Sequence, residues 1–183
     1  MARTGTVLRN TKETQIEVVV NLDGGDVNVK TGIGFFDHML TAFGFYAKIG
    51  LTVQATGDLY VDGHHTVEDV GICLGLALKQ ALGDRAGIRR FGSCYVPMDE
   101  ALTFTALDFS NRPYLVFDAS MPQERIGEYD SCLTVEFMRA LAMNAGITLH
   151  QKCFYGANAH HITEGLFKSF GLAVKDAVKI EGT

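Results

Sequence analysis

Two copies of the motif His-His-x-x-Glu lie 96 residues apart in the chain, at positions 64–68 and 160–164. Each copy opens an apolar pattern of helical spacing, so each is expected on the first turns of a buried helix. Residues four apart share one face of a helix, and a histidine and a glutamate placed in this way can bind the same cation. The second histidine is rotated by about 100° from the first, which predicts that it serves a different ion.

The two motifs supply six candidate metal ligands, and these are His64, His65, Glu68, His160, His161 and Glu164. A single copy is as often a pair of surface or helix-capping histidines as it is a metal site. Two copies at one offset, both at a predicted helix start and both with all three residues, argue against that alternative.

Composition and charge exclude several classes of protein. The chain has 183 residues, of which 47% are hydrophobic and 20% charged, enough for one large domain or two small ones. Its formal charge of -5, with no block of Lys or Arg, argues against nucleic acid as a partner. The first residues form no apolar signal segment, and no apolar run approaches the roughly 18 residues of a membrane helix. We therefore expect a cytoplasmic protein with no membrane partner, and the four cysteines, without a Cys-x-x-Cys pair, are expected to be reduced thiols.

Periodicity predicts the elements that position the motifs. In the first half we expect a short strand at 6–8, a loop at 9–13, a strand at 16–22, a helix at 35–46, a strand at 51–55 and a helix from 64 to about 83. In the second half we expect strands at 101–108 and 114–117, a helix at 133–143, a strand at 147–149 and a helix from 160 to about 179.

The two halves repeat the same order of elements. A shift of 96 aligns residues 50–53 with 146–149 and residues 75–81 with 171–177, which indicates an internal duplication. We divide the chain into a first half, 1–90, and a second half, 91–183, each with one metal motif and joined by residues 83–97. Two such α+β halves, each with helices on one face of its sheet, would stack helix layer on helix layer.

Three further residues are considered as ligands from their positions. His38 lies at the start of the first predicted helix, after Asp37, which could hold an imidazole or cap the helix. Glu136 is its positional partner in the second half after a shift of two residues, whereas His150 aligns with Gln54 and is not supported as a ligand. Nitrogen-rich sites with a carboxylate suit manganese, zinc or iron, and ligand softness does not choose among them.

Six segments of the chain form a recognisable set, and these are 32–40 (GIGFFDHML), 57–58 (GD), 62–69 (DGHHTVED), 90–92 (RFG), 97–101 (PMDEA) and 160–164 (HHITE). Together they resemble imidazoleglycerol-phosphate dehydratase, the hydro-lyase of histidine biosynthesis that converts imidazole glycerol phosphate to imidazole acetol phosphate. The resemblance covers nearly the whole chain. It implies two βββαβα halves with the helices packed between two four-stranded mixed sheets, two Mn²⁺ ions per subunit site, and a metal-bridged homo-oligomer of 24 subunits.

The resemblance also implies how the ligands are shared. One ion would take His38, His64 and Glu68, with His161 from a neighbouring subunit. The other would take Glu136, His160 and Glu164, with His65 from a neighbour. Position 136 departs from the family pattern, because many members have a histidine there.

The remaining roles are likewise implied by the resemblance. Glu13 is the catalytic acid and base and contacts substrate, although by itself it would pass as an ordinary loop carboxylate. Arg90, Arg112 and Lys168 match the cations that contact substrate and its phosphate. His38, His64 and His160 also contact substrate, whose imidazole ring would bind to the metals as an imidazolate and lose hydroxide to give a diazafulvene-like intermediate. Family members commonly continue into a Gly-Thr-rich tail over the phosphate, and this sequence stops before one, so we expect weaker phosphate retention.

Two other classes remain open from the sequence. One is a different bimetallic enzyme, such as a phosphoester or amide hydrolase, that uses the same ligands to activate water. The other is a non-catalytic protein in which metals only join the subunits of a shell.

Overall fold

The structure is a computed structural model that describes residues 3–182. Its strands and helices follow one another as β1 (Thr4–Asn10), β2 (Thr14–Asn21), β3 (Val27–Lys30), α1 (Gly34–Ala47), β4 (Gly50–Gly57), α2 (His64–Leu82), β5 (Phe91–Met98), β6 (Ala101–Asp108), β7 (Tyr114–Asp118), β8 (Arg125–Ile126), β9 (Tyr129–Asp130), α3 (Leu133–Ala145), β10 (Thr148–Tyr155) and α4 (Ala159–Ala177). None of the helices in this described part is long and apolar enough to cross a membrane.

The two halves build sheets of the same topology. The first sheet has the order β1-β2-β4-β3 and the second has the order β5-β6-β10-β7. In each sheet one edge pair is parallel, β3 with β4 and β7 with β10, and the other pairs are antiparallel. Strand β2 shows why these segments form half-buried sheets, because Ile16, Val18 and Val20 alternate with more exposed residues and face the core.

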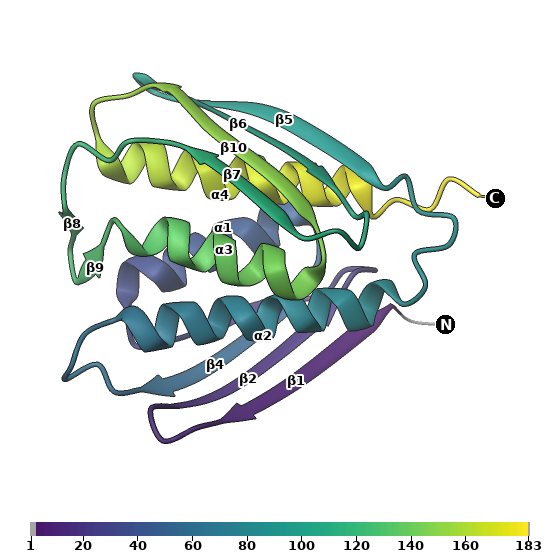
Figure 1. Cartoon of the computed structure of the whole chain (residues 1–183), viewed down its shortest axis with the longest axis horizontal. Coiled ribbons are helices and arrows are strands. Elements are labelled where there is room, and N and C mark those ends of the chain that lie inside the picture. Colours follow the sequence, from purple (N-terminus) through teal and green to yellow (C-terminus); the bar gives the residue numbers. More distant parts are fainter. Residues whose placement is uncertain (1–2, 183) are drawn as a thin grey trace.

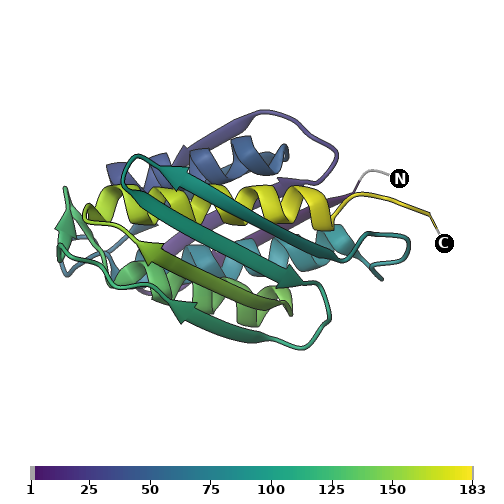
Figure 2. The same cartoon turned by 90° about the horizontal axis from the view of Figure 1, so that it is seen from above.

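The four helices lie between the two sheets, as Figure 1 shows and Figure 2 shows from above. Helices α1 and α2 pack on the first sheet, and α3 and α4 pack on the second. Across the middle, α2 packs against α3 and α1 packs against α4, so each helix pair joins the two halves. One hydrophobic cluster fills this interior and draws on both halves, which confirms the predicted α+β fold with its helices between two four-stranded mixed sheets.

Some elements differ from the sequence prediction. Residues 83–97 were expected to be a connection, but β5 occupies Phe91–Met98, with side chains such as Phe91 and Tyr95 exposed on its outer face. Its sequence, FGSCYVPM, has no regular alternation of polar and apolar residues, so the periodicity did not mark it as a strand. Strand β3 was missed because it has only four residues, and the hairpin β8–β9 because each strand has two. The division of the chain at residue 90 stays a prediction.

Candidate metal centre

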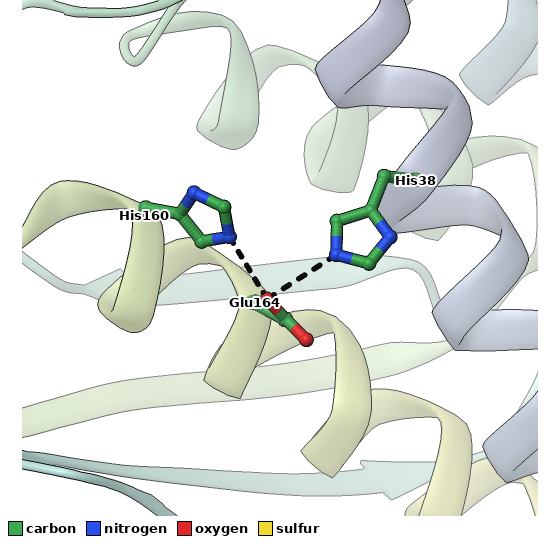
Figure 3. A group of neighbouring side chains, drawn as sticks. All are labelled: His38, His160 and Glu164. Atoms are coloured by element: carbon green, nitrogen blue, oxygen red, sulfur yellow. Dashed lines mark hydrogen bonds and ion pairs between the residues drawn. The ribbon is translucent and has the colours of Figure 1, made fainter.

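His38, His160 and Glu164 form a cluster of potential metal ligands. His160 Nε2 lies 3.0 Å from Glu164 Oε2, and His38 Nε2 lies 3.4 Å from the same oxygen. One ligand atom from each of the three lies within 4.8 Å of the others. Figure 3 shows the two imidazoles turned toward the carboxylate, His38 from α1 and the other two residues from α4. Within residues 3–182 this is the one group of three such side chains that is close enough to hold one ion.

The packing of α1 against α4 creates this cluster. The Phe43 and Phe170 rings stack at 5.0 Å deep in the helix interface, and Phe35 meets the His160 ring edge-on at 4.9 Å. The start of α4 is fixed by Asn158, whose side chain accepts a hydrogen bond from the backbone N–H of His160. His160 and Glu164 then lie one turn apart on the same face.

Glu164 is a buried carboxylate, 6% exposed. Burial by itself would raise its pKa, but the hydrogen bond and charge of Lys168, together with His38 and His160, hold the pKa below its ordinary value. Lys168 Nζ lies 2.8 Å from Glu164 Oε1, while the other oxygen faces the histidines. The carboxylate is therefore ionised and prepared to accept a cation, and Lys168 is placed at this cluster.

The grouping of ligands predicted from the sequence is wrong in one respect. His38 was assigned to one ion with His64 and Glu68, but the structure brings it to His160 and Glu164. The physical reason is the crossed packing of the helices, because α1 lies against α4 and not against α2.

Helix α2 carries the other candidate set. His64 Nε2 lies 3.7 Å from Glu68 Oε2, and both side chains are nearly half exposed. Glu136 lies at the start of α3, the helix that packs against α2, and its carboxylate is paired with Arg139. These three residues are therefore on adjacent helices, although they do not converge as closely as the His38 cluster.

The second histidine of each motif is held by a carboxylate from another element. His65 Nδ1 donates to Asp58 Oδ2 at 2.9 Å, and His161 Nδ1 donates to Glu100 Oε2 at 2.7 Å. These hydrogen bonds raise the pKa of both imidazoles above the ordinary value. His65 and His161 lie outside the three-residue cluster, and the prediction that they serve an ion on another subunit stays a prediction.

Glu13 lies in the exposed turn between β1 and β2. It lines a surface pocket together with Asp58 and Tyr60, and its carbonyl accepts a hydrogen bond from the Asp58 backbone N–H at 3.1 Å. The next residue, Thr14, donates to the buried carboxylate of Asp69 at 2.6 Å. The turn that carries Glu13 is thus linked to α2 through Asp69. It is also linked to Asp58, the residue that hydrogen-bonds His65.

Arg90 and Arg112 converge on a single carboxylate at the end of β6. Arg90 donates to Asp108 Oδ1 at 2.7 Å and to Oδ2 at 3.1 Å, and Arg112 Nη2 lies 3.8 Å from Oδ2. The Arg90 backbone N–H donates to the carbonyl of Ala177, at the C-terminal end of α4. The two arginines therefore lie at the opposite end of α4 from the metal ligands.

Asp37 and His150, which were considered from the sequence, do not take part in the three-residue cluster. Asp37 does not hold an imidazole but accepts hydrogen bonds from the backbone and side chain of Thr31, which fixes the turn before α1. His150 lies exposed on β10, outside the three-residue cluster. Sequence reasoning gave no role to Asp58, Asp69 or Glu100, although each lies in a segment that carried the family resemblance.

The chain is similar in sequence to known proteins. The family model described as imidazoleglycerol-phosphate dehydratase matches residues 31–174. The imidazoleglycerol-phosphate dehydratase of Ruminiclostridium cellulolyticum is 56% identical over 180 residues, 98% of this chain and 93% of that protein. The one from Symbiobacterium thermophilum is 57% identical over 177 residues, 96% of this chain and 85% of that protein.

Solved structures give the same result for the fold. The chain resembles the crystal structure of the Staphylococcus aureus imidazoleglycerol-phosphate dehydratase with a TM-score of 0.89 and 37% identity, covering 97% of this chain and 99% of that one. It resembles the Pyrococcus furiosus enzyme in complex with (S)-C348 with a TM-score of 0.84 and 40% identity, covering 97% and 98%. With a matching family model, sequence and fold, the chain belongs to the imidazoleglycerol-phosphate dehydratase family.

Proposed function

We propose that this protein is a hydro-lyase that dehydrates imidazole glycerol phosphate to imidazole acetol phosphate in histidine biosynthesis. The observation that carries the proposal is the buried, ionised Glu164 with two imidazole nitrogens turned toward it, in a chain of this family. A mixed nitrogen and oxygen donor set at this spacing suits a borderline divalent cation, and Mn²⁺ is the ion we propose.

The side chains of this chain fit two such ions. His38, His160 and Glu164 would hold one, and His64, Glu68 and Glu136, from the adjacent helices α2 and α3, would hold the other. Each ion would gain a further ligand from a neighbouring subunit, His65 in the first case and His161 in the second. This assignment keeps every proposed ligand but exchanges His38 and Glu136 between the two ions.

The reaction requires removal of a weakly acidic C–H proton and departure of a hydroxyl group. When bound, the ions would supply Lewis acidity that stabilises negative charge on the substrate's imidazole ring. Glu13 would accept and return protons as the general base and acid, since its carboxylate is exposed at the edge of a pocket. Lys168 would keep Glu164 ionised and contact the substrate, because its ammonium lies within reach of the cluster.

The separation between the two arginines and the metal cluster supports an assembly of several copies. Arg90 and Arg112 would bind the phosphate through their guanidinium groups. However, Arg90 is anchored at Ala177, 13 residues beyond Glu164, and a helix rises about 1.5 Å per residue, so the two sites lie about 20 Å apart. One small substrate cannot span that distance. The arginines of one chain would therefore complete the metal site of another, in a homo-oligomer for which we propose 24 subunits.

The decisive test is incubation of the Mn²⁺-loaded protein with imidazole glycerol phosphate while the acetol phosphate product and free phosphate are both measured. We expect product without phosphate release, because the ester bond is not attacked. Release of phosphate would instead identify a bimetallic phosphoester hydrolase.

The variant Glu13→Gln separates an enzyme from a shell protein. It removes the proton-transfer carboxylate and leaves the metal ligands unchanged, so we expect no measurable dehydration and an assembly of wild-type mass. Equal turnover in the variant and the wild type would contradict the role of Glu13.

Metal removal tests the bridging of subunits. Treatment with a chelator should convert the assembly into smaller oligomers, and Mn²⁺ should restore it, as measured by light scattering coupled to size-exclusion chromatography. An assembly whose mass does not change on chelation would show that its contacts do not depend on the metal. The cytoplasmic location expected from the sequence stays a prediction.

A further inference from the structure

We propose that Glu100 and Asp58 are positioning residues that hold His161 and His65 in the tautomer with the proton on Nδ1, which leaves the Nε2 lone pair available to a cation outside the chain. The inference rests on the metal-binding part of the proposed function. It gives a role to two carboxylates that neither touch the His38 cluster nor bind substrate in the mechanism above.

The first observation is that both second histidines have the same arrangement. Each imidazole presents Nδ1 to a carboxylate oxygen, at 2.7 Å for His161 and 2.9 Å for His65. An ionised carboxylate can only accept hydrogen bonds, so Nδ1 must be the donor in both pairs. In a neutral imidazole the other nitrogen then carries the lone pair, and that nitrogen is the one able to bind a metal.

The first histidine of each motif lacks this arrangement. His64 and His160 turn Nε2 toward the glutamate four residues later on their own helix, at 3.7 Å and 3.0 Å. The carboxylate partners of the second histidines come instead from outside the helix, Asp58 from the position directly after β4 and Glu100 from the turn between β5 and β6. The two histidines of a motif therefore differ in the nitrogen that is held and in the direction they face.

Both of these imidazole side chains are partly exposed. The His65 side chain is 39% exposed and the His161 side chain is 24% exposed. Asp99 Oδ2 lies 3.7 Å from His161 Nε2, beyond hydrogen-bond distance, and that aspartate is 79% exposed. A second copy of the chain, with its metal cluster, could therefore contact both imidazoles.

Substitution of Glu100 gives a clear test of the tautomer because the second carboxylate oxygen, Oε1, already accepts other hydrogen bonds. Oε1 accepts hydrogen bonds from the backbone N–H groups of Ala157 and Asn158, at 3.0 Å and 2.9 Å, at the start of α4. In Glu100→Gln the amide oxygen must take the place of Oε1, because an NH₂ group there would face the two backbone N–H donors. The NH₂ group would then point at His161 Nδ1, which must become the acceptor, so the ring proton moves to Nε2 and blocks the ligand nitrogen.

By the same chemistry, substitution of Asp58 should weaken metal binding less than substitution of Glu100. Its Oδ1 is buried and has no hydrogen-bond partner within the described residues. In Asp58→Asn the side chain can therefore place its oxygen toward His65 Nδ1, and the tautomer can be kept. The order of effects expected on metal binding is Glu100→Gln greater than Asp58→Asn.

The experiment compares wild type, Glu100→Gln, Asp58→Asn and a control, Asp118→Asn. Asp118 is an exposed strand carboxylate paired with Lys152, so its loss removes a charge without touching a histidine. Mn²⁺ affinity is measured by calorimetry and the mass of the assembly by light scattering. The tautomers are read from imidazole ¹⁵N shifts in metal-free protein labelled at histidine.

We expect Glu100→Gln to weaken Mn²⁺ binding about 10- to 100-fold and to impair assembly, with His161 protonated on Nε2 and the melting temperature of the metal-free protein unchanged. Asp118→Asn should match the wild type. Unchanged Mn²⁺ affinity in Glu100→Gln, or the same His161 tautomer in variant and wild type, would overturn the inference. If wild type binds Mn²⁺ but does not dehydrate the substrate, the proposed function fails while the positioning role stands.

Discussion

Asp69 anchors the turn that carries Glu13, and its removal should damage both stability and turnover. Its Oδ2 accepts a hydrogen bond from Thr14 Oγ1 at 2.6 Å, and its Oδ1 lies 3.1 Å from Arg9 Nε. The carboxylate is 7% exposed, so water does not replace these partners.

The magnitude follows from the two contacts. A buried hydrogen bond to a charged group contributes about 1.5–3 kcal/mol. The Arg9 side chain is 38% exposed, so solvent screens the ion pair and it adds at most about 1 kcal/mol. Asp69→Ala should therefore lower the free energy of unfolding of the metal-free protein by about 2–4 kcal/mol, or about 4–16 °C in melting temperature for a chain of this size.

The effect on turnover should be separate from the loss of stability. Displacement of a catalytic group by about 1 Å can cost about 100-fold in rate, so at a temperature where the variant is folded we expect kcat to fall by about that factor. Asp69→Asn can still accept from Thr14 and should lose about 1 kcal/mol while it keeps most of the turnover.

Thermal unfolding and steady-state kinetics of Asp69→Ala and Asp69→Asn provide the assay. Asp176→Asn, at an exposed ion pair with Lys179, is the matched control and should change stability by less than about 0.5 kcal/mol. A wild-type melting temperature in Asp69→Ala would show that Asp69 does not stabilise the turn that carries Glu13. Reduced stability with unchanged kcat would refute the claim that this anchor positions Glu13.

Three further predictions concern packing, thiol reactivity and the pH dependence of stability. A Cβ added at Gly92 would lie 1.9 Å from the carbonyl oxygen of Ala173, so Gly92→Ala must push α4 from β5 and should cost at least about 1–3 kcal/mol in chemical denaturation. Gly34 has open space, so Gly34→Ala should be neutral or stabilising, and equal stability of the two variants would contradict the close approach. Burial raises the pKa of Cys73 to about 11, whereas Cys132 is exposed, so a thiol reagent at neutral pH should modify Cys132 and spare Cys73 in folded protein. Because the folded pKa of Cys73 lies above its ordinary value of 9.0, its contribution to stability is complete below pH 9 and should be lost as pH rises toward 11.

The two halves share the same strand topology, as the duplication in the sequence indicates, but they do not share every side-chain contact. The shift of 96 aligns Asp69 with Gly165, where a Cβ would come within 2.8 Å of Thr103 Oγ1. The second half therefore has no room for a counterpart of the Asp69 anchor.

The sequence by itself determined the helices, most strands, the duplicated order and the residues able to bind a metal, because these depend on local periodicity and on residue chemistry. The family resemblance supplied Glu13, whose exposed loop position carries no local signal. Short strands such as β3 stayed hidden because four residues are too few to establish a period.

Only the tertiary structure decided which ligands meet. His38 and His160 are 122 residues apart, and nothing local to either one specifies that α1 packs on α4 instead of α2. The same holds for the pairing of His161 with Glu100, 61 positions away. Such contacts depend on how two sheets close over one layer of helices, and that closure is set by the burial of the whole apolar surface at once.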